Sequence, residues 1–195
     1  MYHSYPLTDV EPVITNAELA DWLGVDDTDP LLPVMATTAT SAAIEFLQSE
    51  LISRQRQTIY QEWPSVGTNT APSISPNNIS SKLYIDLPYA RLISVDFLIL
   101  GGTITTDYKE VISLPAKLYI DSPVVTSETG NPAISVTYTA GYGAIADVPQ
   151  AIKSAVSMLA AYMFDHRGAC DAMSALDQSG AAMALTPYKT SVVIL

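Results

Sequence analysis

The chain has 195 residues, of which 48% are hydrophobic and 15% are charged, and it carries a net charge of −11. This length suffices for one domain, alone or with long arms, that buries roughly 70% of the surface of its unfolded chain. The single Cys170 excludes an internal disulfide, the Cys and His residues are too few for a zinc site, and the acidic balance argues against a sequence-independent DNA-binding protein.

The amino-terminal residues predict an irregular arm followed by a short helix. Residues 1–13 lack the basic and apolar stretches of a secretory signal, so we expect none. Thr15 and Glu18 have the spacing of a capping box, and the apolar side of the helix 16–23 ends at Gly24. No apolar run approaches the ~20 residues that span a bilayer, so no membrane segment is expected.

An acidic turn separates this helix from a second, longer one. The turn contains Asp26, Asp27 and Asp29. Pro30 suits the first turn of a helix, because its missing N–H would have no partner there anyway. Apolar residues then recur at near-helical spacing, with small Ala and Thr residues beside them that allow close packing. The sequence therefore predicts a helix over 30–55.

The middle of the chain predicts a small, mostly antiparallel sheet, because apolar and polar residues alternate there. The expected strands cover 58–63, 83–87, 93–99, 108–112, 117–120 and 134–138. One face of the strand 93–99 would carry Ile93, Val95, Phe97 and Ile99.

Two loops of this sheet are candidate contact sites. Residues 65–81 contain no charge and are rich in Ser, Asn, Pro and Thr, and a loop of this length is usually functional or disordered. Gly101 and Gly102 suit a hairpin turn after the strand 93–99. The candidate residues in the longer loop are Ser65, Asn69, Pro72, Pro76 and Asn78.

A Gly-rich turn links the last predicted strand to the longest apolar helix of the C-terminal part. Gly141 lets the backbone turn sharply. Asp147 is the expected N-cap and Pro149 fits the first turn of a helix over 149–167, which Gly168 would end. Together these elements give an α+β fold, with a small bundle of helices packed on one side of the sheet.

The C-terminal end is unusually apolar for a chain terminus. Burial of the four branched aliphatic residues 192–195 would contribute about 1.5–3 kcal/mol each, so we expect all four to be covered. They could fold back on their own sheet or add a strand to the sheet of a neighbouring subunit. We thus expect an N-terminal arm over 1–13, a single α+β domain over 14–168 and a C-terminal docking segment over 169–195.

No catalytic constellation is evident in the sequence. Asp165-His166-Arg167 lies at a predicted helix end, where the helix dipole favours His and Arg. Asp26 and Asp27 could act as acid and base, but they equally suit a charged turn without chemistry. The glycine pairs lack the rest of a phosphate loop, and no serine lies in a nucleophile elbow. We expect no enzyme, no cofactor and no metal site.

The run from the last predicted strand into this helix carries a motif. Residues 138–142 read Tyr-Thr-Ala-Gly-Tyr, and Val148-Pro149 and Ile152-Lys153 follow. This order resembles the head–tail connector (adaptor) proteins of tailed bacteriophages. The resemblance covers most of the chain, because it includes the pair of N-terminal helices, Trp63-Pro64 after the second, an aliphatic central strand and Pro-Tyr-Lys at 187–189.

The resemblance implies a structural adaptor subunit of the virion neck, synthesised in the cytoplasm of a bacterial host. Twelve copies would form a ring, a dodecamer, below the portal protein and offer its far side to a tail, nozzle or stopper protein. The two loops named above would contact the tail side or the next subunit. Candidate contacts with the portal or a neighbouring subunit are Pro187, Tyr188, Lys189, Val192, Val193, Ile194 and Leu195.

Acidic charge is concentrated at the start of the chain. Residues 1–53 hold nine acidic residues and no Lys or Arg. The acidic surface around Asp26, Asp27 and Asp29 is either a solvated face or, in a ring through which a genome moves, part of a lumen that repels phosphates. Packaged DNA would then pass without specific binding.

Three other functions remain open from the sequence. The chain could be another neck component, such as a stopper or tail-completion protein. A carbohydrate- or host-surface-binding β module would use the eleven Tyr residues and the acidic turns, and it predicts a concave aromatic patch. An unrecognised hydrolase is the third. The adaptor interpretation instead predicts a ring and no small-molecule pocket.

Overall fold

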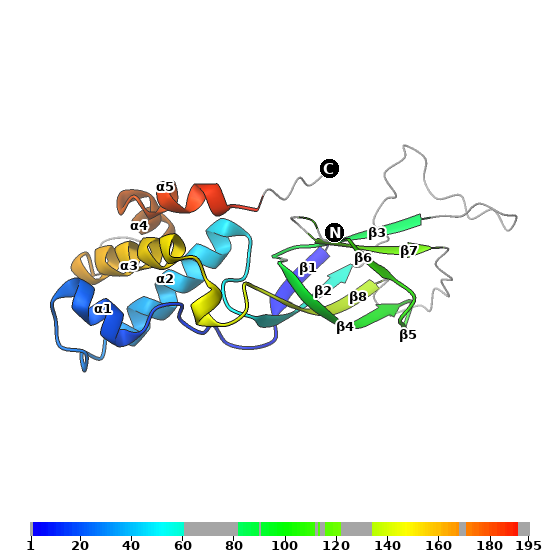
Figure 1. Cartoon of the computed structure of the whole chain (residues 1–195), viewed down its shortest axis with the longest axis horizontal. Helices are drawn as coiled ribbons and strands as arrows, with labels where there is room; N and C mark the ends of the chain where they lie inside the picture. The colour runs from blue at the N-terminus through cyan, green and yellow to red at the C-terminus, as the bar shows by residue number, and fades with distance from the viewer. Residues whose placement is uncertain are drawn as a thin grey trace, which may run out of the picture. The chain divides into compact units, whose positions relative to one another are not determined.

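The computed structural model describes residues 2–60, 82–89, 91–111, 113, 116–121, 134–167 and 171–190 (Figure 1). These residues form two compact units where the sequence predicted one domain. The β unit comprises the described parts of 2–8 and 54–140, and the helical unit comprises those of 9–53 and 141–190. The α+β class is confirmed, with helices and strands separated into different units.

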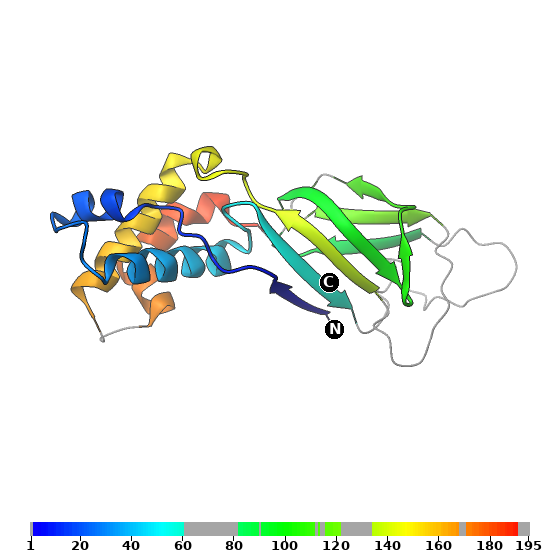
Figure 2. The same ribbon diagram turned by 90° about the horizontal axis from the view of Figure 1, so that it is seen from below.

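The helical unit is organised around two sixteen-residue helices, α2 and α3, which pack against each other (Figure 2). Its elements are α1 Asn16–Leu23, α2 Leu32–Leu47, the 3-10 turn η1 Ile145–Asp147, α3 Gln150–Asp165, α4 Ala172–Gln178, α5 Ala181–Leu185 and the 3-10 turn η2 Thr186–Tyr188. Ala36, Ala39 and Ala43 of α2 are fully buried, as are Ile152 and Leu159 of α3. The short alanine side chains let α2 lie close to its neighbours, as the sequence predicted.

Helix α2 ends at Leu47, well before the predicted end at residue 55. Gln48 adopts a left-handed conformation with φ 52°, and its N–H closes the last helical turn. The chain then turns, and Arg54 opens the strand β2. Leu51, whose spacing favoured a longer helix, is fully buried in this turn instead. Its apolar side chain is therefore satisfied without a helical backbone.

Helix α1 begins at the predicted capping box. Thr15 Oγ1 accepts a hydrogen bond from the N–H of Glu18 at 3.2 Å, and the Glu18 carboxylate accepts one from the N–H of Thr15 at 2.7 Å. The bonds that Glu18 accepts, first from the backbone and then from the hydroxyl of Thr15, lower the pKa of its carboxyl. Gly24, with φ 69°, ends the helix.

Loss of this capping box should weaken the helical unit. Thr15→Ala should lower the free energy of unfolding by about 1 kcal/mol, because the Thr15 hydroxyl that accepts from the N–H of Glu18 is removed. The pKa of Glu18 is lower in the folded than in the unfolded state, so its contribution is complete above the unfolded pKa and is lost as the pH falls through the folded pKa. In chemical denaturation, the stability difference between wild type and Glu18→Gln should shrink toward acid pH. Asp21→Asn on the same helix is the control, and an equal shrinkage there would contradict a role of the box.

The β unit consists of two antiparallel sheets. In spatial order, the five-stranded sheet contains β1 Tyr2–Pro6, β2 Arg54–Tyr60, β8 Ile134–Ala140, β4 Leu92–Leu100 and β5 Thr103–Thr105, and the three-stranded sheet contains β3 Lys82–Leu87, β7 Ala116–Asp121 and β6 Lys109–Val111. Part of the predicted irregular arm is thus an edge strand, because β1 pairs with β2 along its whole length. Trp63 and Pro64 lie outside the described residues.

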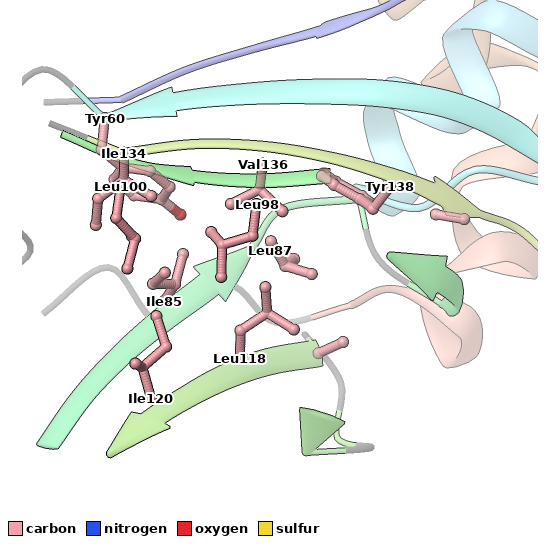
Figure 3. Packing of buried hydrophobic residues seen from close by; sticks show 12 residues of the cluster. Tyr60, Ile85, Leu87, Leu98, Leu100, Leu118, Ile120, Ile134, Val136 and Tyr138 are labelled. Carbon is pink, nitrogen blue, oxygen red and sulfur yellow. The ribbon is translucent and has the colours of Figure 1, made fainter. Parts of the chain in front are cut away.

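The two sheets enclose a core, and its buried members among the described residues all belong to strands (Figure 3). Its members are Tyr60, Ile85, Leu87, Leu98, Leu100, Ala116, Leu118, Ile120, Ile134, Val136, Tyr138 and Ala140. The sequence predicted helices against the sheet, but in this unit a second sheet takes that position. Each sheet has an apolar face, and the apolar faces of the two sheets pack against each other.

Strand β4 carries two register irregularities against β8, and they change which side chains face the core. They fall between Leu92 and Ser94 and between Val95 and Phe97. Val95 packs against the core cluster, whereas Phe97 remains 55% exposed. The prediction that Ile93, Val95, Phe97 and Ile99 share one face is therefore wrong. A bulge adds a residue to one strand and so reverses the alternation beyond it.

Candidate functional site

The Gly of the Tyr-Thr-Ala-Gly-Tyr motif lies against the backbone of another segment. A Cβ placed on Gly141 would lie 2.6 Å from the carbonyl carbon of Ile52 and 2.8 Å from the nitrogen of Ser53. Its φ of 137° is a conformation that favours glycine. The adjacent Tyr142 donates its N–H to the carbonyl of Leu51 at 3.2 Å. This part of the motif is a structural crossing point.

The first tyrosine of the motif joins the two sheets of the β unit. Tyr138 is fully buried, and its hydroxyl donates to the carbonyl of Pro88 and lies 3.3 Å from Thr58 Oγ1. Tyr60 similarly donates its hydroxyl to the carbonyl of Asp86. The buried phenols therefore satisfy backbone acceptors at the sheet interface, which accounts for these tyrosines without a ligand.

The predicted cap of the long C-terminal helix has a different role. Asp147 Oδ2 accepts a hydrogen bond from the N–H of Ala144 at 2.9 Å, so it closes the 3-10 turn η1. Helix α3 starts after Pro149, whose position makes no side-chain cap. The helix ends at Asp165, and Gly168 lies outside the described residues. The prediction of Asp147 as the N-cap of α3 is wrong because a separate turn intervenes.

The predicted C-terminal docking segment is largely part of the helical unit. Leu176 and Leu185, on α4 and α5, are buried. Thr190 is 5% exposed, and its N–H donates to the carbonyl of Leu47 at 2.9 Å. The chain is therefore anchored on α2 at the last residue that the structure describes, and the contacts predicted for residues 187–195 stay predictions.

The candidate residues at this end of the chain differ in what they offer to a partner. Pro187 is exposed and Tyr188 is half-buried. The Lys189 ammonium lies 4.6 Å from the ring centroid of Phe46, so a cation–π contact holds it on its own chain. Val192, Val193, Ile194 and Leu195 lie outside the described residues.

The predicted hairpin turn is present. Gly101 and Gly102 have φ values of 53° and 87° and link β4 to β5, where Leu100 pairs with Thr103. Two positive φ values in a two-residue loop favour glycine at both positions. Gly102 is exposed, so the tip is open to contact. Ser65, Asn69, Pro72, Pro76 and Asn78 lie outside the described residues.

The acidic turn before α2 is held by its own carboxylates. Asp26 accepts bonds from the hydroxyl and the N–H of Thr28, and these bonds lower the pKa of its carboxyl. Asp29 accepts from the N–H of Leu31 at 2.9 Å. Asp27 is exposed. Two of the three carboxylates thus shape the turn, which leaves no need for catalytic chemistry to explain them.

The charged residues at the end of α3 also bind their own helix. His166 Nδ1 lies 2.9 Å from the carbonyl of Tyr162, and the two rings stack at 4.0 Å. Arg167 donates Nε–H to the carbonyl of Phe164 at 2.7 Å. Both side chains therefore contact the last carbonyls of the helix, which accounts for their position without catalytic chemistry.

The described residues contain no group of three or more His, Cys, Asp and Glu side chains placed to hold a metal ion. Within the same part of the chain, no helix has the length and apolar character needed to cross a membrane.

Formal charge differs strongly between the two units. Residues 9–53 and 141–190 hold thirteen acidic and three basic residues, so the helical unit has a net charge of −10. The rest of the chain holds seven acidic and six basic residues, a net charge of −1. The acidic character found in the sequence is therefore a property of the helical unit.

The five-stranded sheet presents a second face, away from the core cluster, which we call the outer sheet face. Because alternate residues point to opposite sides of a strand, it carries the neighbours of the buried positions. Its residues are His3, Tyr5, Gln55, Gln57, Ile59, Asp96, Phe97, Ile99, Ile104, Ser135, Thr137 and Thr139. This surface could not be predicted from the sequence, because the bulges of β4 that expose Phe97 leave no signal in the residue pattern.

Comparison with known proteins first defines the class of fold. No protein-family model matches the chain, and no curated protein matches it in sequence. Solved structures with the same fold do exist, and they come from the neck and virion of gene transfer agent (GTA) particles. At 19–20% identity, this likeness shows the fold alone.

The particular matches extend over nearly complete chains. In the neck of an empty GTA particle computed with C6 symmetry, the matching chain gives a TM-score of 0.69 at 20% identity. The neck of the native GTA particle computed with C12 symmetry gives 0.67 at 20% identity, and the virion of the native particle gives 0.67 at 19%. Each match covers 98% of this chain and 97% of the other. The fold agrees with the head–tail connector resemblance found in the sequence.

Proposed function

We propose that this chain is a structural head–tail adaptor subunit of a phage or phage-like virion. The observation that carries the proposal is the fold likeness to GTA neck chains over 98% of this chain. A fold likeness limited to one unit would support only a shared structural module. The likeness to the GTA neck chains instead includes both the β unit and the helical unit. The same neck structures have sixfold and twelvefold symmetry, which supports a closed ring of twelve copies.

In this proposal the ring lies below the portal protein and joins the DNA-filled head to a tail, nozzle or stopper protein. The packed helices α2 and α3 and the double-layered β unit form the body of a spacer that has no catalytic role. Packaged DNA passes through the ring without specific binding. The net charge of −11 supports this, because phosphates are repelled by an acidic surface.

The contacts are assigned to different segments of the chain. Residues 187–195 bind the portal, which the exposure of Pro187 and the apolar composition of residues 192–195 support. The loop 65–81 or the exposed hairpin at Gly101-Gly102 contacts the next component on the tail side.

The test is a mass measurement by light scattering on the full chain, alone and mixed with the portal protein from the same genome. We expect a complex whose mass fits a ring bound to the portal. Binding to a tail protein but not to the portal would overturn the adaptor position and indicate a stopper or tail-completion protein. A monomer that binds neither would overturn a neck function, and a glycan array would then test the carbohydrate-binding alternative.

Removal of residues 191–195 should abolish portal binding without unfolding the chain. The cut leaves the hydrogen bond from Thr190 to Leu47 in place. Loss of four branched aliphatic side chains should weaken binding at least about tenfold, since burial of one such residue is already worth more than a tenfold change. Portal pull-down and far-UV circular dichroism would measure the two effects.

A matched variant separates length from apolar area in this experiment. Serine at each of the positions 192–195 keeps the tail length and should behave like the truncation. If either variant unfolds, the tail belongs to the core of its own chain. If both variants bind the portal as wild type does, the tail carries no portal contact.

A further inference from the structure

The outer sheet face carries three of the exposed large apolar side chains of the described β unit, those of Tyr5, Phe97 and Ile104. We propose that one copy of the chain contacts the next copy of the ring through this face. The inference rests on the proposed ring-forming function and adds the surface that mediates it.

Strand register aligns the apolar residues of this face in two rows across the sheet. In the first row Tyr5 pairs with Gln57, Gln57 with Thr137, and Thr137 with Phe97. The second row contains His3, Ile59, Ser135, Ile99 and Ile104 in the same order of strands. Phe97 is 55% exposed and Ile104 is 62% exposed. The rows therefore form a continuous patch that is apolar at its β4 and β5 end and of mixed character over β1, β2 and β8.

The polar side chains of this patch already bind one another. The Tyr5 hydroxyl donates to Gln57 Oε1, and Gln57 Nε2 donates to Ser135 Oγ at 2.9 Å. Gln55 Nε2 likewise donates to Asp96 Oδ2 at 2.8 Å. Because these groups keep their partners when water is removed, covering the patch leaves few polar atoms unsatisfied.

Charge identifies a second copy of the chain as the occupant. Two copies repel each other, because each has a net charge of −11. The outer sheet face contains no Lys or Arg and only one carboxylate, Asp96, which bonds to Gln55 and Thr139. A basic partner would be attracted to a surface rich in acidic residues. Two identical acidic copies instead repel each other least where the contacting surface carries few charges. Interface cores are depleted of charge in the same way.

The size of the patch suits the centre of an interface rather than a whole one. Five strands spaced about 4.8 Å apart, and about 14 Å along each strand, give roughly 300 Å². A standard interface buries about 800 Å² on each partner, so neighbouring surface must contribute the rim. In a ring the contact is heterologous, so this face meets a different surface of the next copy.

A charge-matched pair of double variants tests the proposal. Phe97→Lys/Ile104→Lys adds two cations to the outer sheet face, whereas Trp22→Lys/Val34→Lys adds two cations at exposed apolar positions of the helical unit. Trp22 and Val34 are 53% and 54% exposed. Each double variant therefore replaces one aromatic and one aliphatic residue of similar solvent exposure. Both variants lower the repulsion between copies equally.

Ring assembly of the full chain on the portal from the same genome is the first readout, measured by light scattering and electron microscopy. We expect the sheet variant to keep the wild-type circular dichroism spectrum while contact between copies weakens about tenfold or more, and the control variant to assemble normally. Normal assembly of the sheet variant would overturn this inference and leave the adaptor function standing. Failure of wild type to assemble would overturn both.

Photo-crosslinking identifies the occupant directly. The photoreactive amino acid p-benzoylphenylalanine at position 97 keeps an aromatic group on the sheet, so it also serves if the lysine variant fails to fold. A crosslinked product of two copies supports the proposal. A product with the portal or with a tail protein would assign the face to that partner and overturn it.

Discussion

Gly141→Ala should leave little folded protein. The added Cβ would lie 2.6 Å from the carbonyl carbon of Ile52 and 2.8 Å from the nitrogen of Ser53. Both atoms belong to the backbone, which cannot move aside like the end of a side chain. The φ of 137° adds strain for any residue with a Cβ. We expect a loss of about 4 kcal/mol or more, comparable with the whole stability of many domains.

Two other glycines provide graded controls for this result. A Cβ on Gly143 would lie 2.7 Å from Asp147 Oδ2, a side-chain atom that can swing away at the cost of its bond to Ala144. A Cβ on Gly24 would meet nothing within 4 Å, so only its left-handed φ of 69° opposes the change. We expect losses of about 1–3 kcal/mol for Gly143→Ala and about 1 kcal/mol for Gly24→Ala.

Soluble yield and urea denaturation would rank the three variants. A Gly141→Ala protein as stable as Gly24→Ala would contradict the close crossing of the two segments. The expected order has a consequence for the sequence motif, because it makes the glycine a requirement of chain packing. The motif that carried the family resemblance would then identify a fold, and the function would have to be carried by other surfaces.

Elements with a local chemical signal could be predicted from the sequence. The capping box of Thr15 and Glu18 and the Gly24 stop define α1 within a single stretch of chain, and the predicted 16–23 agrees with the observed helix. The same holds for the hairpin at Gly101-Gly102, where glycine suits two positive φ values. Each of these features depends on contacts between residues close in sequence.

Features set by distant contacts could not be predicted. Leu51 has helical spacing, yet α2 stops at Leu47, and the buried position of Leu51 in the following turn depends on tertiary packing. Residues 2–6 look irregular alone and become a strand because β2 offers them an edge. The contact of Lys189 with the ring of Phe46 likewise joins residues far apart in the sequence and could not be predicted.

The reversed alternation of β4 predicts opposite effects at two adjacent residues. Leu98 is fully buried between the sheets, whereas Phe97 is 55% exposed on the outer sheet face. Leu98→Ala should lower the free energy of unfolding by about 2–5 kcal/mol, because it leaves a cavity between Val136 and the opposite sheet. Phe97→Ala should change it by only about 0.5 kcal/mol.

Denaturation curves of both variants, followed by far-UV circular dichroism, would measure this difference, and amide hydrogen exchange would show whether β8 loses protection only in Leu98→Ala. The opposite ranking would restore the regular alternation that the sequence suggested. The outer sheet face would then lose its main aromatic residue. If the expected ranking is found, a failure of Phe97→Lys/Ile104→Lys to assemble cannot be attributed to a damaged core, because Phe97 contributes little to it. The stabilities of Leu98→Ala and Phe97→Ala thus decide how the ring-assembly experiment on Phe97→Lys/Ile104→Lys is interpreted.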